Sequence, residues 1–225
     1  VSAAAFQKFV DGAGEPTSLL RALSKAADEH RVLVHSFDEA EQEALAGSAV
    51  SGDFVVDPKV NEPQITVTLN DNTGAKMSYF LRYDVSVSAT SCVDDVQTFT
   101  AKARLRSTAP RDAGKKLPDY ITGAGEYGIP PGIQLVAVRI FAPAGGELGE
   151  LNLNGAQMDL VRVEQDGRPV GATYIELKPG QTVDLSWTME SGAGQTGGAE
   201  VSVTPTIEKK DGAKALTSAC APKGN

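Results

Sequence analysis

The sequence predicts an α+β protein in which N-terminal helices accompany an antiparallel sheet, followed by an immunoglobulin-like β-sandwich. Three observations support this fold class. Apolar residues recur at helical spacing early in the chain, they alternate strictly with polar residues in the middle, and short alternating segments follow at regular spacing. Hydrophobic residues make up 41% of the 225 residues, so a sizeable core can form.

Residues 16–29 predict the first helix. Pro16 suits a first helical turn, where a missing backbone N–H costs nothing. Apolar side chains at helical spacing share one face: Leu19, Leu20, Leu23, Ala26 and Ala27. Residues 31–37 (RVLVHSF) then predict a short apolar strand. Ser36 and Glu39 have the spacing of a capping box, which predicts that a second helix follows.

Antiparallel strands complete the first region, residues 1–110. Residues 65–69 alternate apolar and polar side chains. Residues 77–89 do so over a longer run, in which Tyr79 falls on the apolar face and Phe80 is the exception. Residues 96–106 form a third alternating segment. Each segment has one polar face, so we expect a meander of strands with one face in water.

Residues 111–131 are rich in proline and glycine and predict a linker loop between two domains. A loop of this length exceeds a normal connection, which favours a functional role. Residues 132–225 then hold six short segments that predict the immunoglobulin-like sandwich: 133–141, 151–153, 158–164, 173–177, 182–189 and 200–207. Asp166 and Gly167 form a dipeptide typical of a tight turn between paired strands.

The charge of the chain excludes some classes of partner. The formal net charge is −8 and the pI is about 4.8. A nucleic-acid binder needs a basic stripe that displaces counterions, so we expect no nucleic-acid partner. No stretch approaches 18 consecutive apolar residues, so we expect no direct membrane insertion by this chain.

The two cysteines, Cys92 and Cys220, are too far apart in sequence for a paired redox or zinc motif. Two unrelated buried thiols are one interpretation. We favour a disulfide, because Cys220 lies in a polar tail, residues 217–225, with few other anchors. A disulfide would place the chain in an oxidising compartment.

The most polar segment of the chain predicts either a turn or a binding surface. It contains the candidate ligand-binding residues Asn70, Asp71, Asn72 and Lys76. Asn, Asp and Gly are the residues that build tight turns, so a plain turn is the simplest interpretation. Alternatively, Asp71 and a neighbouring asparagine offer oxygen ligands to Ca²⁺, although the EF-hand pattern is absent. Lys76 is suited to neutralising an anionic group.

Two aromatic residues of the loop are further candidates for ligand binding. Tyr120 and Tyr127 lie in the Pro/Gly-rich segment, where they can stack on sugars or pack the loop down. His30 and His35 are five residues apart, which is a poor spacing for a metal site. We therefore predict no metal, no cofactor and no catalytic residue from the sequence.

Several motifs in order resemble a known family. They are VHSFDEAEQ (34–42), LNDNTGAKMSYFL (69–81), LPDYITG (117–123), FAPAGG (141–146), GRPV (167–170) and LKPGQT (177–182). Their order and spacing are similar to the C-terminal part of the actinobacterial envelope family called domain of unknown function 4012. The resemblance implies a parent protein anchored by an N-terminal membrane helix, with this part outside the cell. It also implies a link to surface polysaccharide, and it assigns no catalytic residue.

These observations together predict an extracytoplasmic cell-envelope protein. The leading hypothesis is a non-catalytic binding or scaffolding module whose partners are cell-wall polysaccharide or envelope proteins. The first alternative is an enzyme acting on surface glycan or a lipid-linked precursor, with the segments around Asp71 and Tyr120 as the walls of a cleft. The second alternative is a calcium-stabilised adhesive module.

Overall fold

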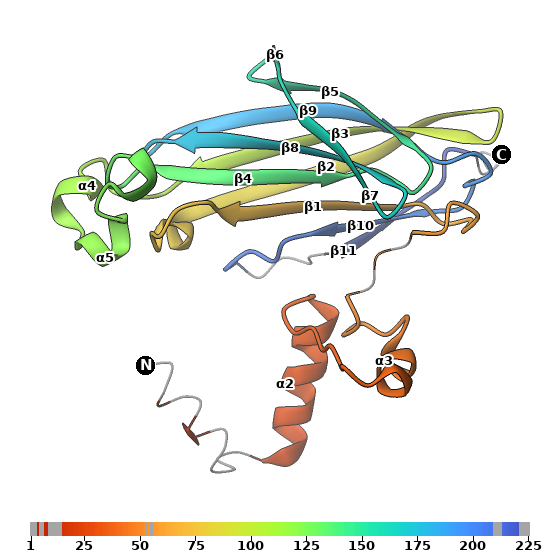
Figure 1. Ribbon diagram of the computed structural model, residues 1–225, viewed down its shortest axis with the longest axis horizontal. Helices are drawn as coiled ribbons and strands as arrows, with labels where there is room; N and C mark the ends of the chain where they lie inside the picture. Colours follow the sequence, from red (N-terminus) through yellow and green to blue (C-terminus); the bar gives the residue numbers. More distant parts are fainter. Residues whose placement is uncertain are drawn as a thin grey trace. The chain divides into compact units, whose positions relative to one another are not determined.

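The structure, a computed structural model, describes residues 4, 7–8, 15–52, 54, 56–208 and 213–220. It has mixed α+β content, as predicted, and divides into two compact units, Val1–Asp53 and Phe54–Asn225 (Figure 1). The predicted domain boundary at residues 111–131 is wrong. Strands from before and after that segment pair with each other in both sheets, so they cannot belong to separate domains.

The first unit contains both of the predicted helices. Helix α2 (Pro16–Asp28) begins at its proline, and helix α3 (Glu39–Leu45) follows. The cap of α3 differs from the prediction, because Asp38 rather than Ser36 is the N-cap residue. The Oδ1 of Asp38 accepts a hydrogen bond from the backbone N–H of Glu41 at 3.0 Å.

The strand predicted at residues 31–37 is wrong. Residues 31–36 form no regular element, and Val34 makes one main-chain contact, from its N–H to the carbonyl of Val50 at 2.8 Å. Leu33 is 58% exposed and Phe37 is 98% exposed. An apolar run becomes a strand only where a second strand pairs with it, and the described part of this unit contains none.

The second unit contains two sheets. The order in the first sheet is β11 (Ala213–Leu216), β10 (Ala199–Val203), β1 (Gln64–Asp71), β4 (Gln134–Phe141), β8 (Arg168–Leu177) and β7 (Val161–Gln165). The order in the second is β2 (Leu81–Val93), β3 (Val96–Ser107), β9 (Thr182–Glu190), β5 (Glu147–Leu153) and β6 (Ala156–Met158). Strands β1 and β10 pair in parallel, and the other described pairs are antiparallel.

The predicted immunoglobulin-like sandwich of residues 132–225 is not confirmed. Strand β1 lies between β10 and β4 in the first sheet, and β2 and β3 form one side of the second. The later strands therefore do not complete a sandwich by themselves. Most predicted strands are present, whereas β11 was not predicted. The turn at Asp166 and Gly167 joins β7 to β8 as expected, with φ angles of 51° and 75°.

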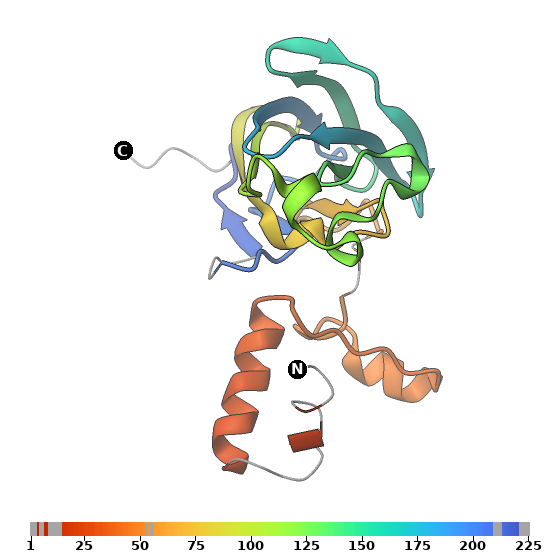
Figure 2. The same ribbon diagram turned by 90° about the vertical axis from the view of Figure 1, so that its left-hand side faces the viewer.

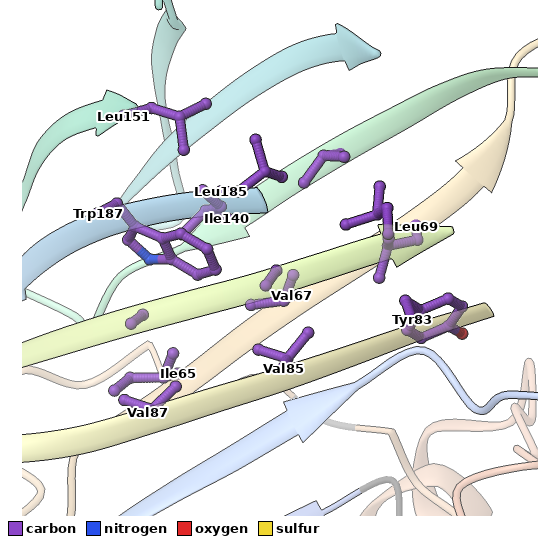
Figure 3. Close-up of a cluster of buried hydrophobic side chains, with 14 of the residues drawn as sticks. Ile65, Val67, Leu69, Tyr83, Val85, Val87, Ile140, Leu151, Leu185 and Trp187 are labelled. Atoms are coloured by element: carbon purple, nitrogen blue, oxygen red, sulfur yellow. The ribbon is translucent and has the colours of Figure 1, made fainter. Parts of the chain in front are cut away.

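The two sheets bury one core between them. Figure 3 shows side chains of β1, β2, β4, β5 and β9 directed into this core. The predicted inner face of β3 is confirmed, because Phe99 and Leu105 are fully buried while Lys102 and Arg104 are exposed. Trp187 on β9 is 2% exposed and packs in the same cluster. Period-two alternation therefore identified the buried face correctly.

Short helices cover one end of the sandwich, which faces the viewer in Figure 2. They are η1 (Met77–Phe80), α4 (Ala113–Lys116), α5 (Asp119–Thr122) and η2 (Glu126–Gly128). A second apolar cluster lies beneath them, made of Ala75, Met77, Ala109 and Ala113 with Phe80, Leu117 and Ile121 packed against it. This cluster explains why the strand predicted from Met77 begins only at Leu81, since burying Met77 turns residues 77–80 into a 3₁₀-helix.

A buried arginine, Arg168 at the start of β8, connects the start of β1 with the residue that follows β4. Arg168 is 1% exposed and donates from Nε to the carbonyl of Ala142 at 3.0 Å. Its two terminal nitrogens donate to the Oε1 and the main-chain carbonyl of Gln64, both at 2.9 Å. The rings of Phe54 and Phe141 stack on each other, and the Cζ of Arg168 lies 5.2 Å and 5.7 Å from their centroids. Burial lowers the pKa of Arg168 to about 10, so it stays charged at neutral pH.

The predicted disulfide between Cys92 and Cys220 is present, with Cα atoms 5.0 Å apart. The buried side chain of Gln97 holds the same C-terminal segment. Its Nε2 donates to the carbonyl groups of Gln195 and Gly197, and its Oε1 accepts from Ala219 N at 2.9 Å. The disulfide indicates an oxidising compartment. Among the described residues, no helix is both long and apolar enough to span a membrane.

We expect Arg168→Lys to lower the free energy of unfolding by about 1–3 kcal/mol, because an ammonium cannot replace the planar fork and leaves buried carbonyls without donors. Urea unfolding followed by Trp187 fluorescence measures this change. Arg139→Lys is the matched control, since Arg139 is exposed on β4, and it should shift the free energy by less than about 0.5 kcal/mol. Equal losses of unfolding free energy in the two variants would contradict the stabilising role of the Arg168 hydrogen bonds.

Replacing Cys92 and Cys220 together by serine should lower the free energy of unfolding by roughly 4 kcal/mol, because the bond closes a long loop in the unfolded chain. The sequence separation of the two cysteines is 128. Urea denaturation of the wild type and the double variant measures the difference. Thiol labelling of the denatured wild type without reductant should find no free thiol, and two free thiols would refute the bond.

Candidate functional site

The loop after β1 has the hydrogen bonds of a tight turn. The Oδ1 of Asp71 accepts from the backbone N–H of Thr73 at 2.9 Å and from its hydroxyl at 2.6 Å. The hydroxyl oxygen of Thr73 in turn accepts from the N–H of Ala75 at 3.1 Å. Asn70 and Asn72 are exposed. The turn predicted for this segment is therefore present, and one oxygen of Asp71 is committed to it.

The other oxygen of Asp71 has a different environment. Its Oδ2 is buried from solvent and has no hydrogen-bond partner in the described part of the chain. A buried acceptor without a donor costs about 1–3 kcal/mol. A turn needs only the Oδ1 contacts, so the turn does not account for the position of Oδ2.

Asp71 lines a cavity of about 360 Å³ at the end of the sandwich, which we call the end cavity. Its lining comes from the loop, η1, the start of β2 and the segment after β10: Leu69, Asp71, Lys76, Ser78, Tyr79, Leu81, Tyr83, Thr204, Pro205, Thr206 and Ile207. Of the four loop candidates from the sequence, Asp71 and Lys76 contribute to this lining and Asn70 and Asn72 do not. The volume lies at the lower end of the range for small-molecule sites.

Sequence reasoning missed most of this cavity. Tyr79 was expected on the buried face of a strand, but it is 64% exposed because residues 77–80 form the 3₁₀-helix η1. Thr204 and Thr206 lie about 130 residues after the loop and carried no signal that pointed to it. The main-chain N–H of Leu69 donates to the hydroxyl of Thr204 at 3.0 Å, which brings this distant segment to β1.

The second candidate segment lies next to the first. The backbone N–H of Lys76 donates to the carbonyl of Ile121 at 2.9 Å. A Cβ added to Gly74 would lie 2.9 Å from the Oε2 of Glu126, so the loop approaches η2 closely. Tyr120 is 71% exposed and Tyr127 is 77% exposed. Neither ring lines the end cavity, and the Cε2 of Tyr127 lies 3.7 Å from the position of a Cβ added to Gly74.

Tyr127 has an unusual backbone. Its φ is 57° and its ψ is 19°, in the left-handed region that bulky residues seldom occupy. Glycines on both sides, Gly125 and Gly128, also have positive φ angles. Holding a tyrosine here costs of order 1–3 kcal/mol, and such costs gather at binding sites. The strain presents an aromatic ring to solvent, where it contributes little to packing.

The described residues contain no group of three or more His, Cys, Asp or Glu side chains that could hold a metal ion. The cavity lining offers one carboxylate, one ammonium group, two tyrosine rings and several hydroxyl groups. This combination is suited to a neutral polyhydroxylated ligand, because both donors and acceptors are present beside an aromatic surface.

Comparisons with known proteins add little. No protein-family model matches this sequence, and no curated protein sequence does so. A proposed nutrient-binding protein of Legionella pneumophila is similar in structure over 64% of this chain and 54% of its own, with 8% identity and a TM-score of 0.34. A zinc metallopeptidase of Deinococcus radiodurans matches over 70% of this chain and 38% of its own, with 10% identity and a TM-score of 0.25. Likenesses this weak carry no argument about function.

Replacing Tyr127 by glycine separates strain from packing. The variant should unfold with a free energy equal to or up to about 1 kcal/mol above that of the wild type, because glycine adopts a positive φ without steric cost. Thermal and urea unfolding measure this. Tyr174→Gly is the control, since Tyr174 is likewise exposed, at 50%, but lies in β8, where glycine weakens a strand. A clear loss of stability in the Tyr127 variant would show that its ring is structural.

Proposed function

We propose that this chain is a non-catalytic binding module of an extracytoplasmic cell-envelope protein, and that it binds surface polysaccharide at the end of the sandwich. The oxidising compartment indicated by the disulfide supports an extracytoplasmic location. The resemblance to domain of unknown function 4012 supports the envelope and the polysaccharide. Membership of that family, with a membrane-anchored parent protein, is part of the proposal.

The observation that carries the proposal is a polar cavity lined by Asp71 and Lys76 and rimmed by the exposed ring of Tyr79. A sugar ring has hydroxyl donors around its edge and apolar C–H groups on its faces. A carboxylate oxygen accepts a hydroxyl donor in a short, charge-assisted hydrogen bond. The ring of Tyr79, which is 64% exposed, offers an apolar surface on which a sugar face can lie.

The other exposed tyrosines extend this surface beyond a single sugar. Tyr120 and Tyr127 lie on segments that contact the Asp71 loop through Ile121 and Glu126. They therefore belong to the same end of the sandwich as the cavity, although they do not line it. We infer that the cavity holds one sugar residue and that the outer tyrosines contact neighbouring residues of the polymer.

The acidic lining of the cavity, which is Asp71 among the described residues, supports binding rather than hydrolysis. Most glycoside hydrolases place two carboxyl groups on either side of the scissile bond, about 5–10 Å apart. Among the described lining residues, Asp71 is the acid of the cavity, and its Oδ1 is already engaged by Thr73. The enzyme and the calcium-stabilised module remain alternatives without an observation in their favour.

Asp71→Asn should weaken binding to surface polysaccharide at least tenfold and change the free energy of unfolding by less than about 1 kcal/mol. The amide oxygen can keep both contacts with Thr73, whereas the amide nitrogen replaces the acceptor at Oδ2 with a donor. A glycan array followed by calorimetry with the strongest ligand measures binding, and urea unfolding measures stability.

Asp166→Asn is the matched control for this variant. Asp166 also lies in a tight turn between strands, with a positive φ that asparagine tolerates, but it does not line the cavity. It should bind the polysaccharide as the wild type does. Unchanged binding in the Asp71 variant, or no binding of any glycan by the wild type, would refute the proposed function.

A further inference from the structure

The sandwich is open along one long side. Strand β2 is the outer strand of one sheet and β11 is the outer strand of the other, and no described strand joins them. Between them lies a slot of about 350 Å³, which we call the edge slot. The strands of this side are labelled in Figure 1. An opening between two sheets exposes their inner faces, which are apolar.

The walls of the edge slot are mainly aliphatic. Strand β2 contributes Val85 and Val87, and strands β10 and β11 contribute Val201, Val203 and Leu216. Val85, Val87 and Val201 are buried, while Val203 and Leu216 are partly buried against the main core. The polar lining residues are Asp84, Ser86, Thr204, Thr206 and Lys214. The aliphatic part of this lining suits a hydrocarbon chain, which makes no hydrogen bonds.

The edge slot adjoins the end cavity. Tyr83, Thr204 and Thr206 line both of them. At this junction the hydroxyl of Tyr83 donates to the carbonyl of Thr204 at 2.6 Å and so links the two sheets. Polarity therefore changes along one continuous side of the molecule, from Asp71 and Lys76 at the end to aliphatic side chains along the edge.

We propose that the edge slot binds the hydrocarbon chain of a glycolipid whose sugar head group occupies the end cavity. The head-group part of this inference rests on the proposed function. A ligand that matches both compartments must be polar at one end and apolar at the other. The slot is close in volume to the smallest ligand pockets, so it suits a single hydrocarbon chain.

Calorimetry with methyl, hexyl and octyl β-D-glucoside, each below its micellar concentration, tests this inference. Kd should fall roughly fourfold for each methylene group that enters the slot. Octyl glucoside carries two more methylene groups than hexyl glucoside, so it is expected to bind about fifteenfold tighter. Equal affinities along the series, or no binding of octyl glucoside, would overturn the assignment of the slot.

Variants of residues that line the edge slot test where the hydrocarbon chain of the ligand binds. Val203→Phe should fill the slot and remove the increase in affinity with the length of the alkyl group. It should leave the affinity for methyl glucoside as it is in the wild type. Val161→Phe is the matched control, because Val161 is 64% exposed on β7 and does not line the slot. Retention of the chain-length gain in the Val203 variant would place the chain elsewhere and refute the proposal.

Two further variants keep the outcomes distinct. If Val203→Phe fails to fold, Val203→Thr makes the wall polar at nearly constant volume and should reduce the gain from octyl over hexyl glucoside severalfold. Asp71→Asn reports on the head group alone. A chain-length gain that depends on Val203, together with no effect of Asp71→Asn on any glycan, would support the slot and refute the polysaccharide site.

Discussion

The insertion of β1 between β10 and β4 is the constraint on which the second unit depends. Strand β1 pairs in parallel with β10 on one side and antiparallel with β4 on the other, so its main chain is hydrogen-bonded along both edges. Ile65 and Val67 are fully buried in the shared core. Because a one-residue slip would turn these side chains outward, the register of β1 is fixed. That register sets where Asp71 leaves the sheet.

The same insertion assembles the candidate site. Strand β10 lies beside β1, so the segment that follows it reaches the loop that follows β1, through the contact of Leu69 with Thr204. The parallel pairing is essential here, since parallel neighbours end at the same edge of a sheet. The side between β2 and β11 is open, because these outer strands belong to different sheets and do not pair. Two sheets whose outer strands do not pair leave their apolar faces accessible at that edge.

Charges and bonds distant from the site hold this arrangement in place. Arg168 joins the start of β1 to the end of β4, because its guanidinium reaches carbonyl groups of Gln64 and Ala142. A buried charge is tolerated there since each terminal nitrogen has an acceptor and two aromatic rings cover the group. The disulfide and Gln97 hold the C-terminal segment beside the turn that joins β2 to β3.

The sequence by itself predicted most of the local elements, the inner face of β3 and the turn at Asp71, and it favoured the pairing of Cys92 with Cys220. These depend on periodicity, turn chemistry and cysteine count, which neighbouring residues encode. Only the tertiary structure decided that β1 joins strands from the far end of the chain, that Tyr79 is exposed, and that Thr204 meets the loop. Long-range pairing depends on which faces bury each other, and no local pattern records that choice.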